Sequence, residues 1–214
     1  MTSIALYPPT VATDAPYEQM NRWCALALAI ALSPLLLLIA FLIWYEDGRP
    51  LLFAHYRVGR NGRLFRCFKF RTMVRNADQV LAELLARDPA ACEEWQRDQK
   101  LINDPRITRI GRFLRRTSLD ELPQLINIWR GEMNFVGPRP IVVPELARYG
   151  AYKRHYLSVK PGVTGLWQVS GRNNTTCERR VELDRRYVER HTLLLDAMIV
   201  FKTIKVVITR EGAR

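Results

Sequence analysis

The sequence contains little that could build a zinc site or a disulfide framework. Its 214 residues include three histidines and four cysteines, and the cysteines are Cys24, Cys67, Cys92 and Cys177. They are widely scattered and form no C-x-x-C pair, so neither metal-ligand spacing nor a disulfide pattern is indicated. We interpret them as reduced thiols that act as small apolar side chains in a cytosol-facing protein.

Familiar nucleotide and nucleic-acid signatures are also missing. The sequence has no G-x-G-x-x-G or Walker loop and no evident helix-turn-helix, zinc or RNA-recognition pattern. It has no internal repeat and no low-complexity tract. Its length suits one catalytic unit, with or without a membrane element.

Acidic residues are scarce relative to basic ones. The chain has 33 Lys and Arg against 21 Asp and Glu, a formal net charge of +12. This excess favours an anionic partner, which would be a nucleic acid, an acidic lipid or a phosphorylated small molecule. A membrane-tethered basic nucleic-acid-binding protein is therefore the alternative hypothesis, and it predicts steeply salt-dependent binding. The missing signatures argue against it, and we expect no nucleic-acid partner.

Charge is absent altogether from one long run. No residue from Trp23 to Tyr45 is charged. At ~1.5 Å per residue, a helix of this length matches the ~30 Å hydrocarbon core of a bilayer, so we predict a membrane helix. A cleaved signal peptide fits poorly, because Asp14 and Glu18 precede the run and no small-residue cleavage site follows it.

Ser33-Pro34 lies in the middle of this run. Proline removes a helical hydrogen bond and clashes with the preceding turn, so it bends or breaks the helix. A kinked span would place the N-terminus outside, because arginines follow the run and mark the cytoplasmic side. A re-entrant hairpin would keep both ends in the cytosol. The residues alone favour the span, since simple kinks are common in membrane helices.

A second apolar segment extends from Leu193 to Ile208 and is too short to cross a bilayer. Lys202, Lys205 and Thr209 fall on one stripe of a helix drawn through it. This pattern fits an amphipathic helix in the headgroup region, with its lysines toward anionic lipid. An ordinary helix that packs on the core fits it equally well.

Two hairpins are predicted between these apolar segments. Residues 51–56 and 64–70 are β-prone and flank Gly59-Arg60-Asn61-Gly62, and Asn-Gly is a strong β-hairpin signal. The second strand leads into Lys69-Phe70-Arg71, whose cationic side chains either point toward a phosphate or lie at a solvated strand end. Residues 76–101 are predicted to form a helical hairpin that restarts at Asp88-Pro89.

Two adjacent carboxylates, Asp120 and Glu121, follow a basic run. Ser118-Leu119-Asp120-Glu121 matches the Ser-x-x-Glu capping box, and Pro123 is tolerated only near a helix start, so a helix should begin close to this point. A capping box uses only one carboxylate, that of Glu121. Asp120 then has no capping role and projects ~100° away from Glu121 around the helix axis. This geometry lets one carboxylate attack while its neighbour holds a metal.

A carboxylate nucleophile at a helix start would repel a phosphorylated substrate unless a cation lies between them. Mg²⁺ is the natural choice, because it takes oxygen ligands and few of them from protein. Arg112, Arg115 and Arg116 add positive charge within a turn or two, and the fork of arginine suits phosphate.

Two Gly- and Pro-bearing loops come later in the chain. In Gly137-Pro138-Arg139-Pro140 each proline fixes its own φ and restricts its predecessor, so Arg139 is presented with little entropy left to lose. A structural corner is the alternative. The segment 161–172 has three glycines that permit close backbone approach, which is a weak hint of a nucleotide site that ordinary turns explain nearly as well.

Taken together, these motifs resemble the bacterial sugar transferase family, the monotopic polyprenyl-phosphate hexose-1-phosphate transferases that start exopolysaccharide and O-antigen repeat units. The resemblance extends from about Arg22 to the C-terminus. The motifs that carry it are Arg57-x-Gly59-x-x-Gly62-x-x-Phe65, Lys69-Phe70-Arg71-Thr72-Met73, Thr117 to Gln124, Val136-Gly137-Pro138-Arg139-Pro140, and Lys160-Pro161-Gly162 through Arg172.

The resemblance implies an enzyme. A UDP-hexose would give its sugar 1-phosphate to a polyprenyl (undecaprenyl) phosphate with release of UMP, as the first step of polysaccharide repeat-unit assembly. Asp120 would attack the β-phosphorus and form a phosphosugar-enzyme intermediate that the lipid phosphate resolves, while Glu121 binds Mg²⁺, so ping-pong kinetics are expected. The candidates for holding phosphates are Lys69, Arg71, Arg112, Arg139 and Arg172, with Arg139 the strongest.

The resemblance also implies a helix-rich α+β fold. Residues 1–21 would be an N-terminal flank, and residues 22–47 a re-entrant membrane helix bent at Ser33-Pro34 with both termini cytosolic. Residues 48–214 would be a cytosol-facing catalytic domain with a small β-hairpin and a C-terminal interfacial helix. The expected location is the cytoplasmic face of the bacterial inner membrane, where anionic lipid is a partner.

Overall fold

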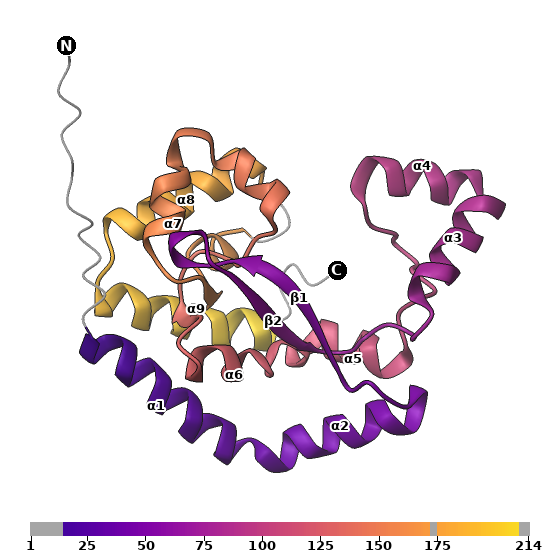
Figure 1. Cartoon of the computed structure of the whole chain (residues 1–214), viewed down its shortest axis with the longest axis horizontal. Helices are drawn as coiled ribbons and strands as arrows, with labels where there is room; N and C mark the ends of the chain where they lie inside the picture. Colours follow the sequence, from indigo (N-terminus) through magenta and orange to yellow (C-terminus); the bar gives the residue numbers. More distant parts are fainter. Residues whose placement is uncertain (1–14, 172–174, 210–214) are drawn as a thin grey trace.

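The computed structural model describes residues 15–171 and 175–209. Within these ranges, side chains are described up to Val206, except that of Asp98. The described chain is helix-rich with two small sheets, so the predicted α+β class is confirmed (Figure 1). Its α-helices are α1 (Ala15–Ala31), α2 (Ser33–Asp47), α3 (Ala77–Arg87), α4 (Pro89–Asp98), α5 (Arg109–Thr117), α6 (Gln124–Trp129), α7 (Lys153–Ser158), α8 (Cys177–Glu189) and α9 (Leu193–Thr209). The strands are β1 (Leu52–Val58), β2 (Leu64–Phe70), β3 (Asn134–Val136) and β4 (Gly162–Thr164), and short 3₁₀ segments are η1 (Arg60–Gly62), η2 (Leu119–Glu121), η3 (Val143–Tyr152) and η4 (Trp167–Val169).

The N-terminal apolar run forms two helices that meet at Leu32 and are bent by 64°. Pro34 lies in the first turn of α2, where its missing N–H would have had no helical partner in any case. The predicted bend is therefore confirmed at Ser33-Pro34. Among the described helices none is long and apolar enough to cross a membrane by itself, whereas α1 and α2 together have the required length and composition.

The predicted β-hairpin is also confirmed. β1 and β2 pair antiparallel from Leu52 opposite Phe70 to Val58 opposite Leu64. The turn between them places Asn61 and Gly62 at φ 58° and 75°, the left-handed region that asparagine and glycine tolerate best. The hairpin is attached to α6 by the Asn127 side chain, which donates to the Arg66 carbonyl at 2.7 Å and accepts from the Phe68 amide at 3.0 Å.

α3 and α4 form the predicted helical hairpin and project from the rest of the molecule (Figure 1). Asp88 restarts the chain as predicted, because its carboxylate accepts from the amides of Ala90 and Ala91 at 2.9 and 3.1 Å. The apolar face expected on α3 is only half-buried, since α3 has no fully buried residue. The hairpin therefore packs mainly on itself.

A second, parallel sheet consists of β3 and β4. Asn134 lies opposite Gly162 and Val136 opposite Thr164, so the loops that follow both strands start from the same edge. Gly162 is required here, because a Cβ at this position would lie 2.1 Å from the Gly137 amide nitrogen. The sheet thus places the Arg139 loop beside the glycine-bearing segment after β4.

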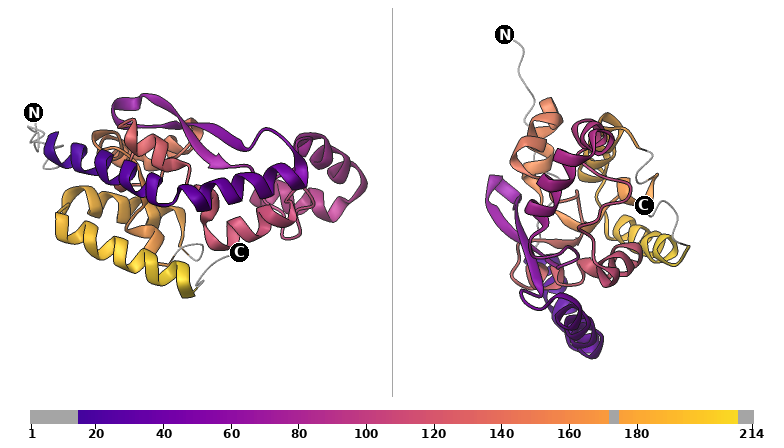
Figure 2. Two further views of the ribbon diagram at one scale, coloured as in Figure 1. Left: turned by 90° about the horizontal axis from the view of Figure 1, so that it is seen from below. Right: turned by 90° about the vertical axis from the view of Figure 1, so that its right-hand side faces the viewer.

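α9 has two different faces. Ile199 is buried in the core, whereas Leu194, Phe201 and Ile204 are more than half exposed. Lys202 is exposed as well. One face of α9 therefore packs on the protein, as the core interpretation expects, and the other presents large apolar side chains beside lysine. In Figure 1 the N-terminal ends of α9 and α1 lie close together and the two helices diverge, and in Figure 2 they run in the same direction.

Candidate active site

The two carboxylates, Asp120 and Glu121, lie in η2, the 3₁₀ turn that directly follows α5. Ser118 ends α5 with φ 57°, and its amide donates to the Arg115 carbonyl at 3.3 Å. A 3₁₀ turn starts at once at Leu119, and α6 follows Pro123. The prediction of a helix start at this point is confirmed, but the predicted capping box is wrong. Because Ser118 adopts the left-handed conformation that closes α5, its side chain makes no capping hydrogen bond.

Contacts from α2 fix the start of α5. The Glu46 carboxylate accepts from the amides of Arg109 and Ile110 at 2.7 and 3.0 Å, which satisfies two free N–H groups of the first turn. α5 also packs tightly against the backbone at Thr72, because a Cβ on Gly111 would lie 2.1 Å from the Thr72 carbonyl oxygen. The bent helix pair therefore determines where the carboxylates sit.

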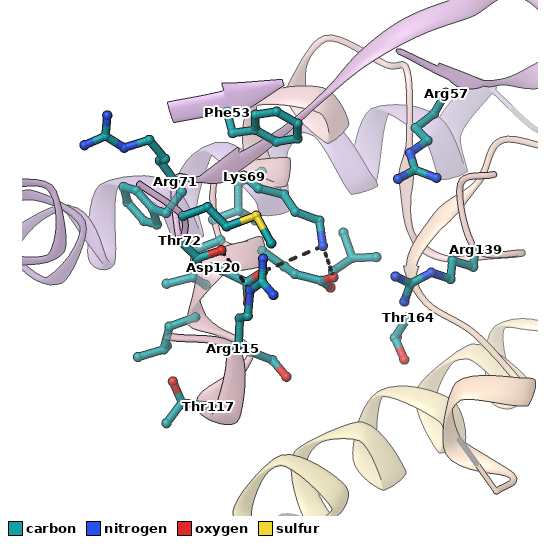
Figure 3. A pocket seen from close by; sticks show the side chains of 18 of the residues that line it. Phe53, Arg57, Lys69, Arg71, Thr72, Arg115, Thr117, Asp120, Arg139 and Thr164 are labelled. Carbon is teal, nitrogen blue, oxygen red and sulfur yellow. Dashed lines mark hydrogen bonds and ion pairs between the residues drawn. The ribbon is translucent and has the colours of Figure 1, made fainter. Parts of the chain in front are cut away.

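Asp120 is buried, with 9% of its surface exposed, and Glu121 is half-buried. The Lys69 ammonium from β2 donates to Glu121 Oε1 at 2.6 Å and lies 3.7 Å from Asp120 Oδ2 (Figure 3). Burial raises the pKa of Asp120 above its ordinary value, and the Glu121 charge adds to this increase, while Lys69 and Arg115 oppose it. Asp120 is thus a desolvated carboxylate with a cation close by, which suits a nucleophile.

Further cations surround the pair. Arg115 lies beside Asp120, and its Nε donates to Thr72 Oγ1 at 2.8 Å. Burial lowers the pKa of Arg115, and Asp120 opposes the decrease. Arg57 and Arg139 extend from the opposite wall toward Lys69 (Figure 3). The arrangement leaves a space between cations of two walls, which suits the oxygens of a diphosphate.

The structure brings five of the predicted site residues to one cavity, which is lined by Asp120, Glu121, Lys69, Arg71 and Arg139. This cavity has a volume of about 1040 Å³, at the upper end of the range for small-molecule sites. Arg139 also stacks near Trp167, with its guanidinium carbon 6.0 Å from the ring centre.

Other predicted residues are placed differently. Arg71 lines the cavity, but its guanidinium donates to the carbonyls of Asp47 and Gly48 at 3.0 and 2.9 Å and pairs with the Asp47 carboxylate at 3.0 Å. These contacts hold the end of α2, and Figure 3 shows the side chain turned away from Asp120. Its role as a phosphate ligand stays a prediction. Arg172 lies outside the described residues.

Arg112 does not line the cavity, whereas Arg115 does, so a phosphate-binding role of Arg112 stays a prediction. They are three positions apart, about 4.5 Å along the helix axis, so Arg112 lies nearly one turn farther from the carboxylates. Arg115, which belongs to the same predicted basic run, is therefore the arginine of α5 that lines the cavity. Its position in the last turn before the pair was the available signal.

The sequence reasoning also missed Arg57, Thr72 and Gln168 as cavity residues. Arg57 lies on β1 next to buried Val58. It precedes Asp120 by 63 positions in the chain, so no local sequence pattern relates the two residues. Gln168 donates to the Val163 carbonyl at 3.2 Å. Its segment gave only the weak nucleotide signal of the glycine-bearing loop.

The fit to Mg²⁺ can be judged from the donor atoms. Within residues 15–171 and 175–209 no group of three or more His, Cys, Asp or Glu side chains could enclose a metal. Mg²⁺ does not need such a cage, because it is commonly held by one or two carboxylates together with substrate phosphates. The Lys69 ammonium already lies against both carboxylates, which shows that the pair attracts a cation. Asp120 and Glu121 therefore fit a metal whose coordination the substrate completes.

Sequence comparison agrees with this geometry. The pattern of the family described as "Bacterial sugar transferase" matches residues 17–210, so the chain belongs to the bacterial sugar transferase family. Among its relatives is the undecaprenyl-phosphate galactose phosphotransferase of Salmonella typhimurium, which is 54% identical over 193 residues that cover 89% of this chain and 40% of that protein.

Two further relatives differ in length. The exopolysaccharide production protein ExoY of Sinorhizobium fredii is 51% identical over 189 residues, covering 88% of this chain and 84% of that protein. The UDP-glucose:undecaprenyl-phosphate glucose-1-phosphate transferase of Escherichia coli is 36% identical over 207 residues, covering 89% of this chain and 41% of that protein. The chain thus spans about 40% of the longer relatives and most of the ExoY protein.

Proposed function

We propose that the chain transfers a hexose 1-phosphate from a UDP-sugar to polyprenyl (undecaprenyl) phosphate and releases UMP. This reaction would begin the assembly of a polysaccharide repeat unit. The single observation that carries the proposal is the buried Asp120 carboxylate in a cavity lined by Lys69, Arg115 and Arg139. The names of the relatives support the substrate classes, because they include undecaprenyl phosphate and a UDP-sugar.

In the first half-reaction an Asp120 oxygen attacks the β-phosphorus of the UDP-sugar. A bond forms between that oxygen and phosphorus, and the bond from phosphorus to the bridging oxygen breaks, so UMP leaves with the bridging oxygen. The product is an aspartyl phosphosugar. The low exposure of Asp120 favours this step, because a desolvated carboxylate is less masked by water.

In the second half-reaction a phosphate oxygen of the lipid attacks the same phosphorus. The bond to Asp120 breaks, the carboxylate is restored, and the polyprenyl diphosphosugar leaves. The two substrates thus react in turn at one carboxylate. Ping-pong kinetics should follow, with UMP released before the lipid binds.

Each cation has a part in this scheme. Lys69 and Arg115 offset the charge on Asp120 and would bind the phosphate oxygens that approach it. Arg57 and Arg139 on the opposite wall would orient the departing UMP phosphate. Mg²⁺, when bound, would neutralise charge on the transferring phosphates, and Glu121 is the residue proposed to hold it.

A membrane location at the cytoplasmic face of the bacterial inner membrane is part of the proposal. Large apolar side chains are exposed on α1, α2 and α9, among them Trp23, Phe41 and Phe201 at 65%, 54% and 73%. Exposed apolar surfaces of this kind mark membrane or protein contacts. We infer that α1 and α2 form a re-entrant hairpin bent at Ser33-Pro34, and that α9 lies in the headgroup region beside anionic lipid. Both ends of the pair then stay on the side where UDP-sugars are found.

Relatives of the chain are named as a galactose phosphotransferase and a glucose-1-phosphate transferase, so the alternative of a nucleic-acid-binding protein is not proposed. The test uses purified chain in nanodiscs with Mg²⁺, undecaprenyl phosphate and a panel of UDP-hexoses. UMP release is expected with at least one sugar and should disappear in Asp120→Asn. Glu93→Gln, a change of an exposed carboxylate on α4, is the matched control and should keep activity. Absence of UMP with every sugar would overturn the proposal.

A further inference from the structure

One wall of the active-site cavity is apolar, in contrast to the cationic walls around Asp120. It is built from α1, the segment after η2, the parallel sheet and α9. The side chains that form it are Leu28, Leu122, Leu125, Phe135, Val163 and Val206. None of the proposed steps at phosphorus uses these residues. A UDP-sugar is polar along most of its length, so it gives no reason for such a wall.

The apolar wall is continuous with the site of reaction. Leu122 and Leu125 follow Asp120 by two and five positions and line the same cavity. On the far side, Thr164 of β4 lies near Arg139 and bonds to Thr203 of α9, with 2.7 Å between the two hydroxyl oxygens (Figure 3). This contact fixes α9 against the sheet, so the wall is part of the folded core rather than a loose flap.

The apolar wall also reaches the outer surface. Leu28 is 39% exposed and lies on the helix that carries exposed Trp23 and Ile30. Val206 is half-buried and lies two residues after exposed Ile204. Each helix therefore has apolar side chains both inside the cavity and on the outside.

α1 and α9 are in direct contact near their N-terminal ends. The Tyr17 hydroxyl donates to Asp196 Oδ2 at 2.6 Å, and from this end the two helices diverge in the view of Figure 1. Leu28 lies 11 positions after Tyr17, and Val206 lies 10 positions after Asp196. Leu28 and Val206 therefore lie well beyond this contact along each helix and both line the cavity, and Leu28 is also exposed at the outer surface.

We propose that the apolar wall between α1 and α9 binds the first isoprene units of the lipid acceptor and so delivers its phosphate to Asp120. This inference rests on the proposed function and adds the residues that select the acceptor. The occupant is an alkyl phosphate, because the six side chains of the wall are apolar and line the same cavity as a carboxylate surrounded by cations. In the ping-pong scheme, the donor half-reaction does not need these residues.

The test compares residues two positions apart on the same helix. Leu28→Asn and Val206→Asn change cavity-lining side chains, whereas Ile30→Asn and Ile204→Asn change exposed ones that do not line the cavity. Each variant is measured in nanodiscs of fixed lipid composition. The readouts are the UMP burst without acceptor and the KM for undecaprenyl phosphate.

We expect the two cavity variants to keep the UMP burst while the KM for undecaprenyl phosphate rises about tenfold or more, the usual effect of a lost apolar contact. The two control variants should keep both values. An unchanged acceptor KM in the cavity variants, or an equal rise in the controls, would overturn the inference. Absence of a burst in the unmodified chain would instead defeat the proposed function, so the two failures are distinguishable.

A second measurement needs no variant that might fold poorly. The unmodified chain in nanodiscs is photo-crosslinked to a polyprenyl phosphate analogue with a diazirine on its first isoprene unit. Crosslinks are expected on peptides that contain Leu28 or Val206, and competition with undecaprenyl phosphate should remove them. Crosslinks confined to other peptides would contradict the inference.

Discussion

Asp184 should make the stability of the protein depend on pH. The residue lies on α8 and is 2% exposed. Its Oδ2 accepts from the Tyr149 hydroxyl at 2.7 Å, and its Oδ1 has no hydrogen-bond partner among the described residues. Burial raises the pKa of Asp184 from 3.8 to about 7.

The sign follows from which state holds the proton. Between pH 3.8 and about 7 the carboxyl is ionised in the unfolded chain and protonated in the folded one. The folded state then binds more protons, so the free energy of unfolding falls as pH rises through this window. At about 1.36 kcal/mol per pH unit, the total decrease is on the order of 4 kcal/mol. Above about pH 7 this group adds no further pH dependence.

Asp184→Asn removes this titration and leaves an acceptor for Tyr149. The change also buries an amide, which costs about 1–3 kcal/mol at every pH, so the slope with pH is the diagnostic quantity rather than the absolute stability. Thermal or denaturant unfolding between pH 4.5 and 8 should show a flatter profile than the unmodified chain. Glu93→Gln, at an exposed position, should leave the slope unchanged. Equal slopes in Asp184→Asn and the unmodified chain would refute the reasoning.

Three further predictions concern the site. Arg115→Gln should slow the UMP burst by about 10- to 100-fold through loss of a charge-assisted contact, whereas Arg112→Gln on the exposed side of α5 should change it little; equal effects of the two would contradict the placement of Arg115. Glu121→Gln should raise the Mg²⁺ concentration for half-maximal rate, and an unchanged Mg²⁺ titration would remove Glu121 as the metal ligand. Asp120→Asn should abolish UMP release yet melt at an equal or higher temperature, because it removes a buried carboxylate whose pKa is raised by desolvation; a marked loss of thermal stability would show a structural role instead.

Local chemistry made part of the fold predictable. Asn61-Gly62 encodes a left-handed turn, and Pro34 is tolerated only in the first turn of a helix, so one helix must end before it and another begin there. The β-hairpin and the bend therefore followed from the sequence. Asp88-Pro89 likewise encodes a cap and restart. In each case the residues that determine the structure are adjacent in the chain.

The site was harder to predict, because it depends on the rotation of α5 about its axis and on contacts between segments that are far apart in the sequence. Whether Arg112 or Arg115 faces the carboxylates is set by how α5 packs on Thr72, which the helical period alone does not determine. The capping box failed because Ser118 closes the preceding helix. Arg57 enters only through the hairpin pairing, a contact between segments far apart in sequence.

The apolar wall could not be predicted from the sequence either, because it also depends on contacts between distant segments. Its six residues come from five segments, and each taken singly resembles an ordinary core or surface position. Only the parallel pairing of β3 with β4 and the contact between Thr164 and Thr203 bring them to one cavity. Its function remains a proposal that the paired variants test.

The most direct measurement is peptide mass spectrometry of protein loaded with a UDP-hexose in the absence of lipid acceptor. The account predicts one hexose-phosphate adduct on the peptide that contains Asp120, removed on addition of undecaprenyl phosphate. An adduct on Glu121 or on another side chain, or turnover that persists in Asp120→Ala, would contradict it.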